Sequence, residues 1–342
     1  MTVNELMAQV RSEMTGDLKK DMRHLSDIAD DLRREPNAEE LVAAVAEYAF
    51  GLMPQNMKEQ MQELTFVGDR RMDQAYAAAL KLVEAKKMQE AETILAAISD
   101  KIAAHFESES PKFYCFRNPF EYHMYREFYP DDKVFERAPF DFSAYLELYG
   151  YVLIENGKTR AAEKALDRAV RFNAVSADVR FERAELYKLA DNMPKLLDEC
   201  RETLRICTTP GRIARTLTNV GFYCYKMNDF FNAAVFYFES IRFQPSKAVE
   251  YELQDVVKRM NSYGQKFTPP THGQIVDAYE KYALTQQPST ELVNLALTLA
   301  QSAHDQQQKE LEGLFLRTAY DLTNDAKMKE QLDALAAEIA QG

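Results

Sequence analysis

Apolar residues recur along this chain at helical spacing, and one arrangement of small and large residues returns several times. Three clear copies lie in 143–174, 177–208 and 214–245, and a fourth lies in 75–98. In each copy an apolar stripe is followed by a polar turn and a second stripe. Apolar positions at i, i+3, i+4 and i+7 are typical of amphipathic helices. Each copy is therefore expected to form a helical hairpin.

A small residue marks the same place in the first helix of the three clear copies. Gly150, Ala184 and Gly221 follow one another at intervals of 34 and 37 positions, close to the ~34-residue period of tetratricopeptide units. On these residues the chain resembles the tetratricopeptide-repeat (TPR) family. The resemblance implies an all-α, right-handed α-solenoid of antiparallel hairpins. Each hairpin would bury its apolar face on its neighbours, and the first helices would line a concave groove.

The rest of the chain is expected to continue this architecture as one solenoid, because no flexible linker interrupts it. We expect irregular N-terminal helices with a degenerate hairpin in 1–66, a TPR-like hairpin in 67–105, an aromatic-rich insertion in 106–142, three TPR-like repeats in 143–245, and helical hairpins with a capping helix in 246–342. Pro36 should separate two N-terminal helices, since proline disfavours helix at the residue before it. No strand pairing is expected.

The insertion at 106–142 breaks the repeat and holds 12 of the 38 aromatic residues of the chain. Its spacing predicts a short helix over 119–128. Each aromatic side chain buries ~150–250 Å² when packed, so the segment must dock on something. Three interpretations follow: an internal packing element that replaces a hairpin, a wall or plug in the groove, or an exposed aromatic patch for a partner.

Charge and composition exclude several classes of partner. The formal net charge of −12 disfavours nucleic acid and anionic membranes, because both repel an acidic protein at long range. No apolar run approaches the ~20 residues that span a bilayer. The first residues, MTVNELMAQVRSEM, lack the basic start and apolar centre of a secretory signal. We therefore expect a cytoplasmic protein. The expected source is bacterial.

Few residues offer catalytic or metal-binding chemistry. Cys115, Cys200, Cys207 and Cys224 are expected to be reduced, structural thiols, because no secretion signal is present and Cys200 and Cys224 fall on apolar stripes. The five histidines include no pair at metal-ligand spacing on one helix. The motifs GxxxxGK[ST], GxSxG and HExxH are absent from the sequence. We expect no catalysis, no cofactor and no bound metal.

The TPR resemblance implies which side chains face the groove, by counting from the small residue of each first helix. The expected binding residues are Tyr151, Phe181, Arg215, Asn219, Phe222, Tyr225 and Lys226. Family members that grip a carboxylate carry Lys or Asn where this chain has Glu147 and Glu182, so that activity is not expected. Arg215 with Asn219 could bind a single carboxylate or carbonyl. The alternative is that these residues form an ordinary solvated face.

The expected function is that of an interaction scaffold, which binds a protein or peptide segment in the concave groove. A second hypothesis is a structural or regulatory protein that self-associates and whose groove is filled by the insertion at 106–142. A third is an α-solenoid enzyme whose site is assembled across helices and leaves no motif.

Overall fold

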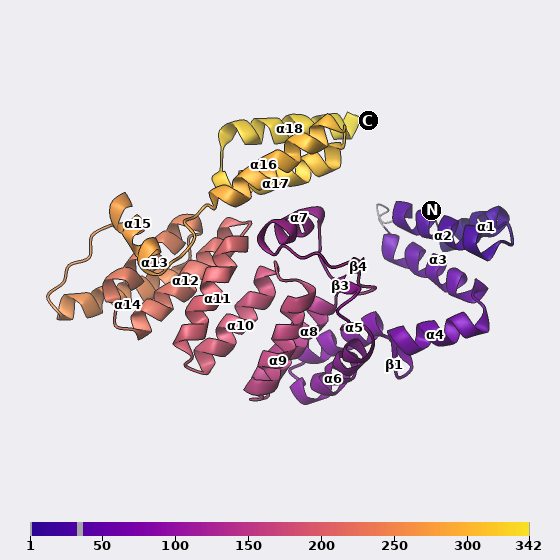
Figure 1. Cartoon of the computed structure of the whole chain (residues 1–342), viewed down its shortest axis with the longest axis horizontal. Coiled ribbons are helices and arrows are strands. Elements are labelled where there is room, and N and C mark those ends of the chain that lie inside the picture. Colours follow the sequence, from indigo (N-terminus) through magenta and orange to yellow (C-terminus); the bar gives the residue numbers. More distant parts are fainter. Residues whose placement is uncertain (1, 33–36, 342) are drawn as a thin grey trace. The chain divides into compact units, whose positions relative to one another are not determined.

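The computed structural model describes residues 2–32 and 37–341, which form two compact units, 1–74 and 75–342 (Figure 1). Both are built almost entirely from helices, and the expected all-α helical-repeat architecture is confirmed. Pro36, which we expected to separate two helices, lies outside the described residues. No helix in the described ranges has the length and apolar character needed to cross a membrane.

The first unit contains the four N-terminal helices. These are α1 (Val3–Glu13), α2 (Leu18–Leu32), α3 (Ala38–Leu52) and α4 (Gln55–Thr65). Leu6 and Val10 of α1 are buried with Leu25, Leu41 and Val45 of the next two helices. The opening helix is therefore part of a small three-helix core.

Two short strand pairs correct the expectation that no strands pair. Antiparallel β1 (Phe66–Val67) and β2 (Arg70–Arg71) flank a tight turn, and parallel β3 (Lys112–Tyr114) and β4 (Phe135–Arg137) lie within the insertion. Both pairs occur where the helical period is broken. Backbone N–H and C=O groups in such segments have no helical partners, so they bond to each other.

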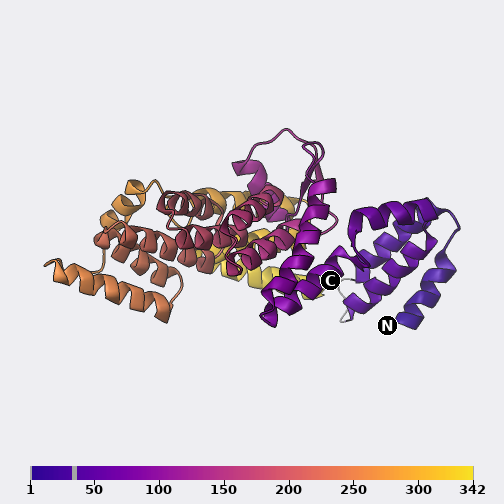
Figure 2. The same ribbon diagram turned by 90° about the horizontal axis from the view of Figure 1, so that it is seen from below.

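The second unit begins within α5 (Met72–Glu84), continues through α6 (Met88–His105) and contains the three clear repeats as hairpins. They are α8 (Phe142–Glu155) with α9 (Thr159–Phe172), α10 (Ala177–Leu189) with α11 (Met193–Ile206), and α12 (Pro210–Lys226) with α13 (Phe230–Phe243). Each hairpin packs on the next, and Figures 1 and 2 show them as successive layers. The hairpins predicted from the sequence are present.

The small residues lie where the two helices of a hairpin come closest. A methyl group added at Gly150 would lie 2.5 Å from the Leu166 side chain, and one at Gly221 would lie 2.7 Å from the Tyr237 ring. Both distances are too short for a side chain to fit without movement of its neighbour. Glycine at these positions therefore sets the separation between the paired helices.

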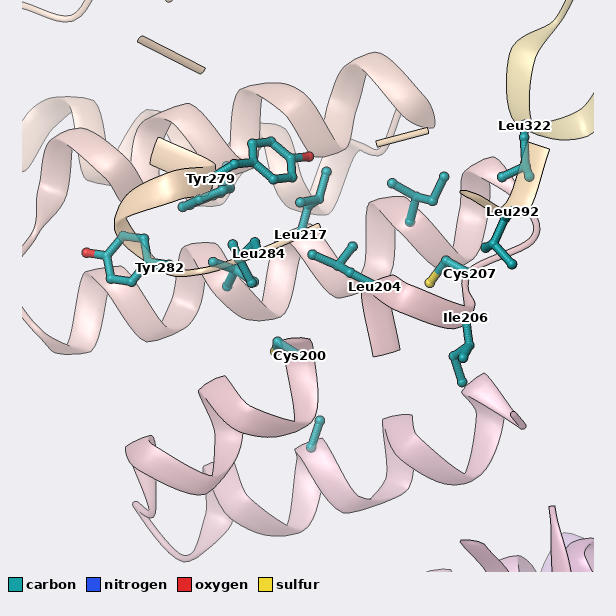
Figure 3. Packing of buried hydrophobic residues seen from close by; sticks show 14 of the residues in the cluster. Cys200, Leu204, Ile206, Cys207, Leu217, Tyr279, Tyr282, Leu284, Leu292 and Leu322 are labelled. Carbon is teal, nitrogen blue, oxygen red and sulfur yellow. The ribbon is translucent and has the colours of Figure 1, made fainter. Parts of the chain in front are cut away.

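The C-terminal part continues with α14 (Lys247–Ser262), α15 (His272–Lys281), α16 (Thr290–Asp305), α17 (Lys309–Thr323) and α18 (Ala326–Gln341). Helices α14 and α15 both pack on α13, α16 pairs with α17, and α18 packs on α17. The linker 282–289 leads from α15 to α16. Figure 3 shows two of its buried residues, Tyr282 and Leu284, in the cluster that also contains Cys200 and Leu204 of α11.

The insertion is an internal packing element, the first of the three interpretations. Its helix α7 (Pro119–Phe128) has the predicted bounds. Of its twelve aromatic residues only Tyr122, at 39%, is exposed. The Phe120 ring lies 6.1 Å from that of Phe315 in α17, and the Tyr129 hydroxyl accepts a hydrogen bond from Arg180 in α10. The insertion thus connects the repeats to the C-terminal hairpin.

Candidate functional site: the first-helix face

Helices α8, α10 and α12 contact one another in sequence order, and together they form what we call the first-helix face. A hollow of about 460 Å³ opens on it between α5, α8, α10 and the end of the insertion. We call it the acidic hollow, and it is lined by Tyr76, Arg117, Asp141, Ala144, Glu147, Leu148, Tyr151, Asp178 and Glu182. Tyrosine rings and carboxylates share its wall.

Acidic groups outnumber basic groups in the lining of the acidic hollow, with four carboxyl groups and one guanidinium. Arg117, from the insertion, donates from Nη1 to Asp178 Oδ2 at 2.7 Å and from Nη2 to Ser176 Oγ at 2.7 Å. Arg212 donates to the same Asp178 oxygen at 2.9 Å. Burial alone would raise the pKa of Asp178, but these two arginines hold it below its usual value. The negative charge of Asp178 is therefore balanced by two arginines.

Glu147 and Glu182 are far less compensated. Each side chain is 23% exposed, and the nearest cations are Arg117 Nη2 at 3.9 Å from Glu147 and Arg215 Nη2 at 4.0 Å from Glu182. No described residue donates a hydrogen bond to either carboxylate. Burial raises the pKa of Glu147 to about 7 and also raises that of Glu182. Both carboxylates can therefore accept a donor from outside the fold.

Two of the predicted binding residues differ from expectation because they are buried. Phe181 is 3% exposed and Asn219 is 2% exposed. The Arg215 guanidinium lies 4.2 Å from the centre of the Phe181 ring, and a cation over an aromatic face is attractive. Neither the Phe181 ring nor the Asn219 amide is therefore exposed to a ligand on this face.

The other predicted residues lie along the first-helix face but do not converge on one point. Tyr151 lines the acidic hollow. Lys188 Nζ lies 5.5 Å from the centre of the Phe222 ring, and Lys226 forms an ion pair with Asp191 at 2.8 Å. The Tyr225 hydroxyl accepts a hydrogen bond from Arg259. Basic groups on this face are thus largely occupied by other parts of the chain.

Sequence reasoning missed Tyr76, Arg117 and Asp141, which complete the acidic hollow. Tyr76 could have been found by the same counting in the fourth copy, 75–98. It lies three positions before the small residue Ala79, as Glu147 lies three positions before Gly150. Arg117 and Asp141 belong to the insertion, where the repeat gives no register from which to count.

The described residues contain no group of three or more His, Cys, Asp or Glu that could hold a metal ion. All four cysteines are free and buried. Burial raises the pKa of Cys115 to about 12, so its thiolate is scarce at neutral pH.

No family model matches this chain, and no curated protein matches it. Among solved structures, the chain is similar to PilF of Pseudomonas aeruginosa, with 11% identity, a TM-score of 0.41, and coverage of 77% of this chain and 96% of that one. It is also similar to a chain of the APC/C hetero-tetramer Cut9–Hcn1, with 11% identity, a TM-score of 0.41, and coverage of 97% of this chain and 54% of that one.

Residues 143–245 form stacked helical hairpins, with small residues spaced 34 and 37 positions apart. The paired helices come close together at Gly150 and Gly221. The fold is tetratricopeptide-like. In helical-repeat arrays of this kind each hairpin is stabilised by its neighbours.

Proposed function

We propose that this chain is a protein-interaction scaffold that binds a peptide or protein segment along its first-helix face. The observation that carries the proposal is the acidic hollow, where Glu147 and Glu182 lie beside the tyrosine rings without a hydrogen-bond donor. Partly buried carboxylates that lack donors are costly to leave unpaired. A bound segment would supply the missing donors and cover the aromatic walls.

An extended segment suits this surface better than a compact ligand. Candidate binding groups follow three successive first helices, with Tyr151 on α8, Glu182 on α10, and Arg215 and Phe222 on α12. Tyr225 and Lys226 of α12 would have to exchange their contacts with Arg259 and Asp191 for contacts with the segment. Repeat arrays commonly use such extended surfaces for recognition. The insertion contributes Arg117 and Asp141 to the wall of the acidic hollow and leaves about 460 Å³ unfilled. This favours an external segment over the hypothesis of a groove filled by the insertion.

Affinity capture with matched variants tests the proposal. The groove variant combines Glu147→Gln with Tyr151→Ala. The control combines Glu163→Gln with Lys195→Ala, an ion pair between the second helices α9 and α11. Proteins retained from native lysate by the wild type and the control should be lost from the groove variant, with circular dichroism unchanged. Retention of the same proteins by all three chains would move the binding surface away from the first-helix face.

A further inference from the structure

Arg117 shows which chemistry the acidic hollow accepts. Although it belongs to the insertion, its guanidinium reaches the first-helix face and bonds to Asp178 and Ser176 of the next repeat, within 3.9 Å of Glu147 and 4.0 Å of Asp141. The chain thus already places one of its own cations in this hollow. Charge-assisted bonds from a guanidinium to carboxylates are among the stronger hydrogen bonds in proteins.

Arg117 satisfies only one side of the acidic hollow. Asp178 receives bonds from two arginines, whereas Glu147 and Glu182 each have a cation no nearer than 3.9 Å and accept no hydrogen bond from a described residue. The unfilled volume lies beside these two carboxylates and is walled by Tyr76 and Tyr151. The remaining space therefore combines two carboxyl groups that lack hydrogen-bond donors with aromatic surface.

We infer that the first-helix face selects a segment presenting one basic side chain, lysine or arginine, to Glu147 and Glu182, and that Arg117 is the specificity-determining residue that limits the number to one. The inference rests on the proposed function. Long basic side chains pack their methylene stems on apolar surface while the charged head stays polar. The rings of Tyr76 and Tyr151 suit the stem, and cations are attracted to ring faces.

Arg117 limits the number of basic side chains by neutralising its own neighbours. Without its guanidinium, Asp141 would lose the cation at 4.0 Å and Asp178 would keep only Arg212. A second cation would then be attracted to this end of the hollow. Replacement by glutamine removes the charge and the Nη donors to Asp178 and Ser176 but keeps a polar side chain. Thermal unfolding of Arg117→Gln therefore shows whether a changed peptide preference comes from the charge or from a loss of folding.

The test is a selection of random dodecapeptides, displayed on phage, against the immobilised full chain. Three forms are compared: the wild type, Glu147→Gln with Glu182→Gln, and Arg117→Gln. Thermal unfolding of each form checks folding. Enriched peptides are synthesised, and their affinities are measured again with norleucine in place of the basic residue.

We expect wild-type peptides to contain one basic residue among apolar neighbours, and to bind at least tenfold more weakly when norleucine replaces it or when both glutamates are amides. Arg117→Gln should enrich peptides with two basic residues. Peptides that bind equally well with norleucine would overturn the inference and leave peptide binding intact. An unchanged preference in Arg117→Gln would remove the role of Arg117, and failure to enrich any peptide would count against the proposed function itself.

Discussion

At the scale of single residues, Glu147 is the group in which burial and charge oppose each other most clearly. Burial is the main cause that raises its pKa to about 7, with Asp178, Glu182 and Asp141 adding to the rise and Arg117 opposing it. An unperturbed glutamate titrates near ~4.3. Between these two values the folded chain binds a proton that the unfolded chain has released.

The first prediction is a pH-dependent effect of Glu147→Gln on stability. Because the folded pKa lies above the unfolded pKa, the contribution of Glu147 is fully present below pH ~4.3 and falls as pH rises through about 7. Glutamine does not titrate, so Glu147→Gln does not lose this stability as the pH rises. Relative to the wild type it should gain roughly 1–3 kcal/mol between pH 5 and pH 8.

Urea unfolding of both chains at pH 5 and pH 8 measures this difference. Glu182→Gln is a useful comparison, because its carboxylate also has a raised pKa in the same hollow. If wild type and Glu147→Gln change in parallel across this interval, Glu147 does not titrate as described.

The second prediction compares two glycines in helices of the second unit. Gly221→Ala places a methyl group 2.7 Å from the ring of Tyr237, which is buried, and overpacking of this kind costs roughly 1–3 kcal/mol. Gly273→Ala meets nothing within 4 Å, so helix propensity should make it neutral or up to ~1 kcal/mol stabilising. Chemical denaturation of both variants gives the two values. Equal effects would mean that Gly221 does not set the helix separation.

At the scale of elements, the insertion is stabilised by contacts with helices distant in sequence. Arg180 of α10 links three elements, since it donates to the Ala174 carbonyl, to Glu199 of α11 at 3.0 Å and to the Tyr129 hydroxyl at 3.0 Å. Arg180 and Glu199 are both buried, and a buried charge is tolerated only when it is paired and bonded. The segment directly after α7 is therefore fixed at a point where two hairpin helices meet, α10 and α11.

The third prediction concerns the contact between α7 and α17. Phe120→Ala removes a buried ring that packs beside Phe315, and buried Phe→Ala changes typically cost 3–5 kcal/mol. Tyr122→Ala, an exposed position on the same helix, should cost less than ~1 kcal/mol. Thermal unfolding and the rate of proteolysis within 106–142 measure both effects. Similar destabilisation by the two variants would contradict the docking of α7 through Phe120.

The elements that the sequence predicted well are those whose signal is local. A hairpin such as 143–174 carries its apolar stripes, its turn and its glycine within about thirty residues, so the sequence alone predicts where its helices lie. The same counting predicted that Glu147 and Tyr151 lie on the first-helix face. Arg117 could not be placed, because its partner Asp178 is 61 positions away and nothing in the insertion has the repeat period. Burial of Phe181 was missed for a similar reason, since Arg215 of the next repeat lies over its ring.

At the scale of the whole molecule, all four cysteines lie in the second unit and inside its core. The fourth prediction is that the native chain reacts slowly with a thiol reagent such as DTNB, because burial raises the pKa of these thiols and blocks access. Denaturation without reductant should release four reactive thiols. A count below four would reveal a disulfide, and fast reaction of the native chain would contradict the buried core.

The linker 282–289 bonds to a helix that is far away in the sequence, which is unusual in a repeat array. Arg201 donates to the Tyr282 carbonyl and Gln287 to the Leu204 carbonyl, which join residues 81 and 83 positions apart. An array whose repeats meet only their neighbours has low contact order, and it can fold from any starting repeat. These two bonds instead form only when a loop of about eighty residues closes. The chain loses conformational entropy on closure before the new contacts stabilise it. Attachment of the C-terminal hairpin is therefore expected to be the late, slow event in folding, after the repeats have assembled.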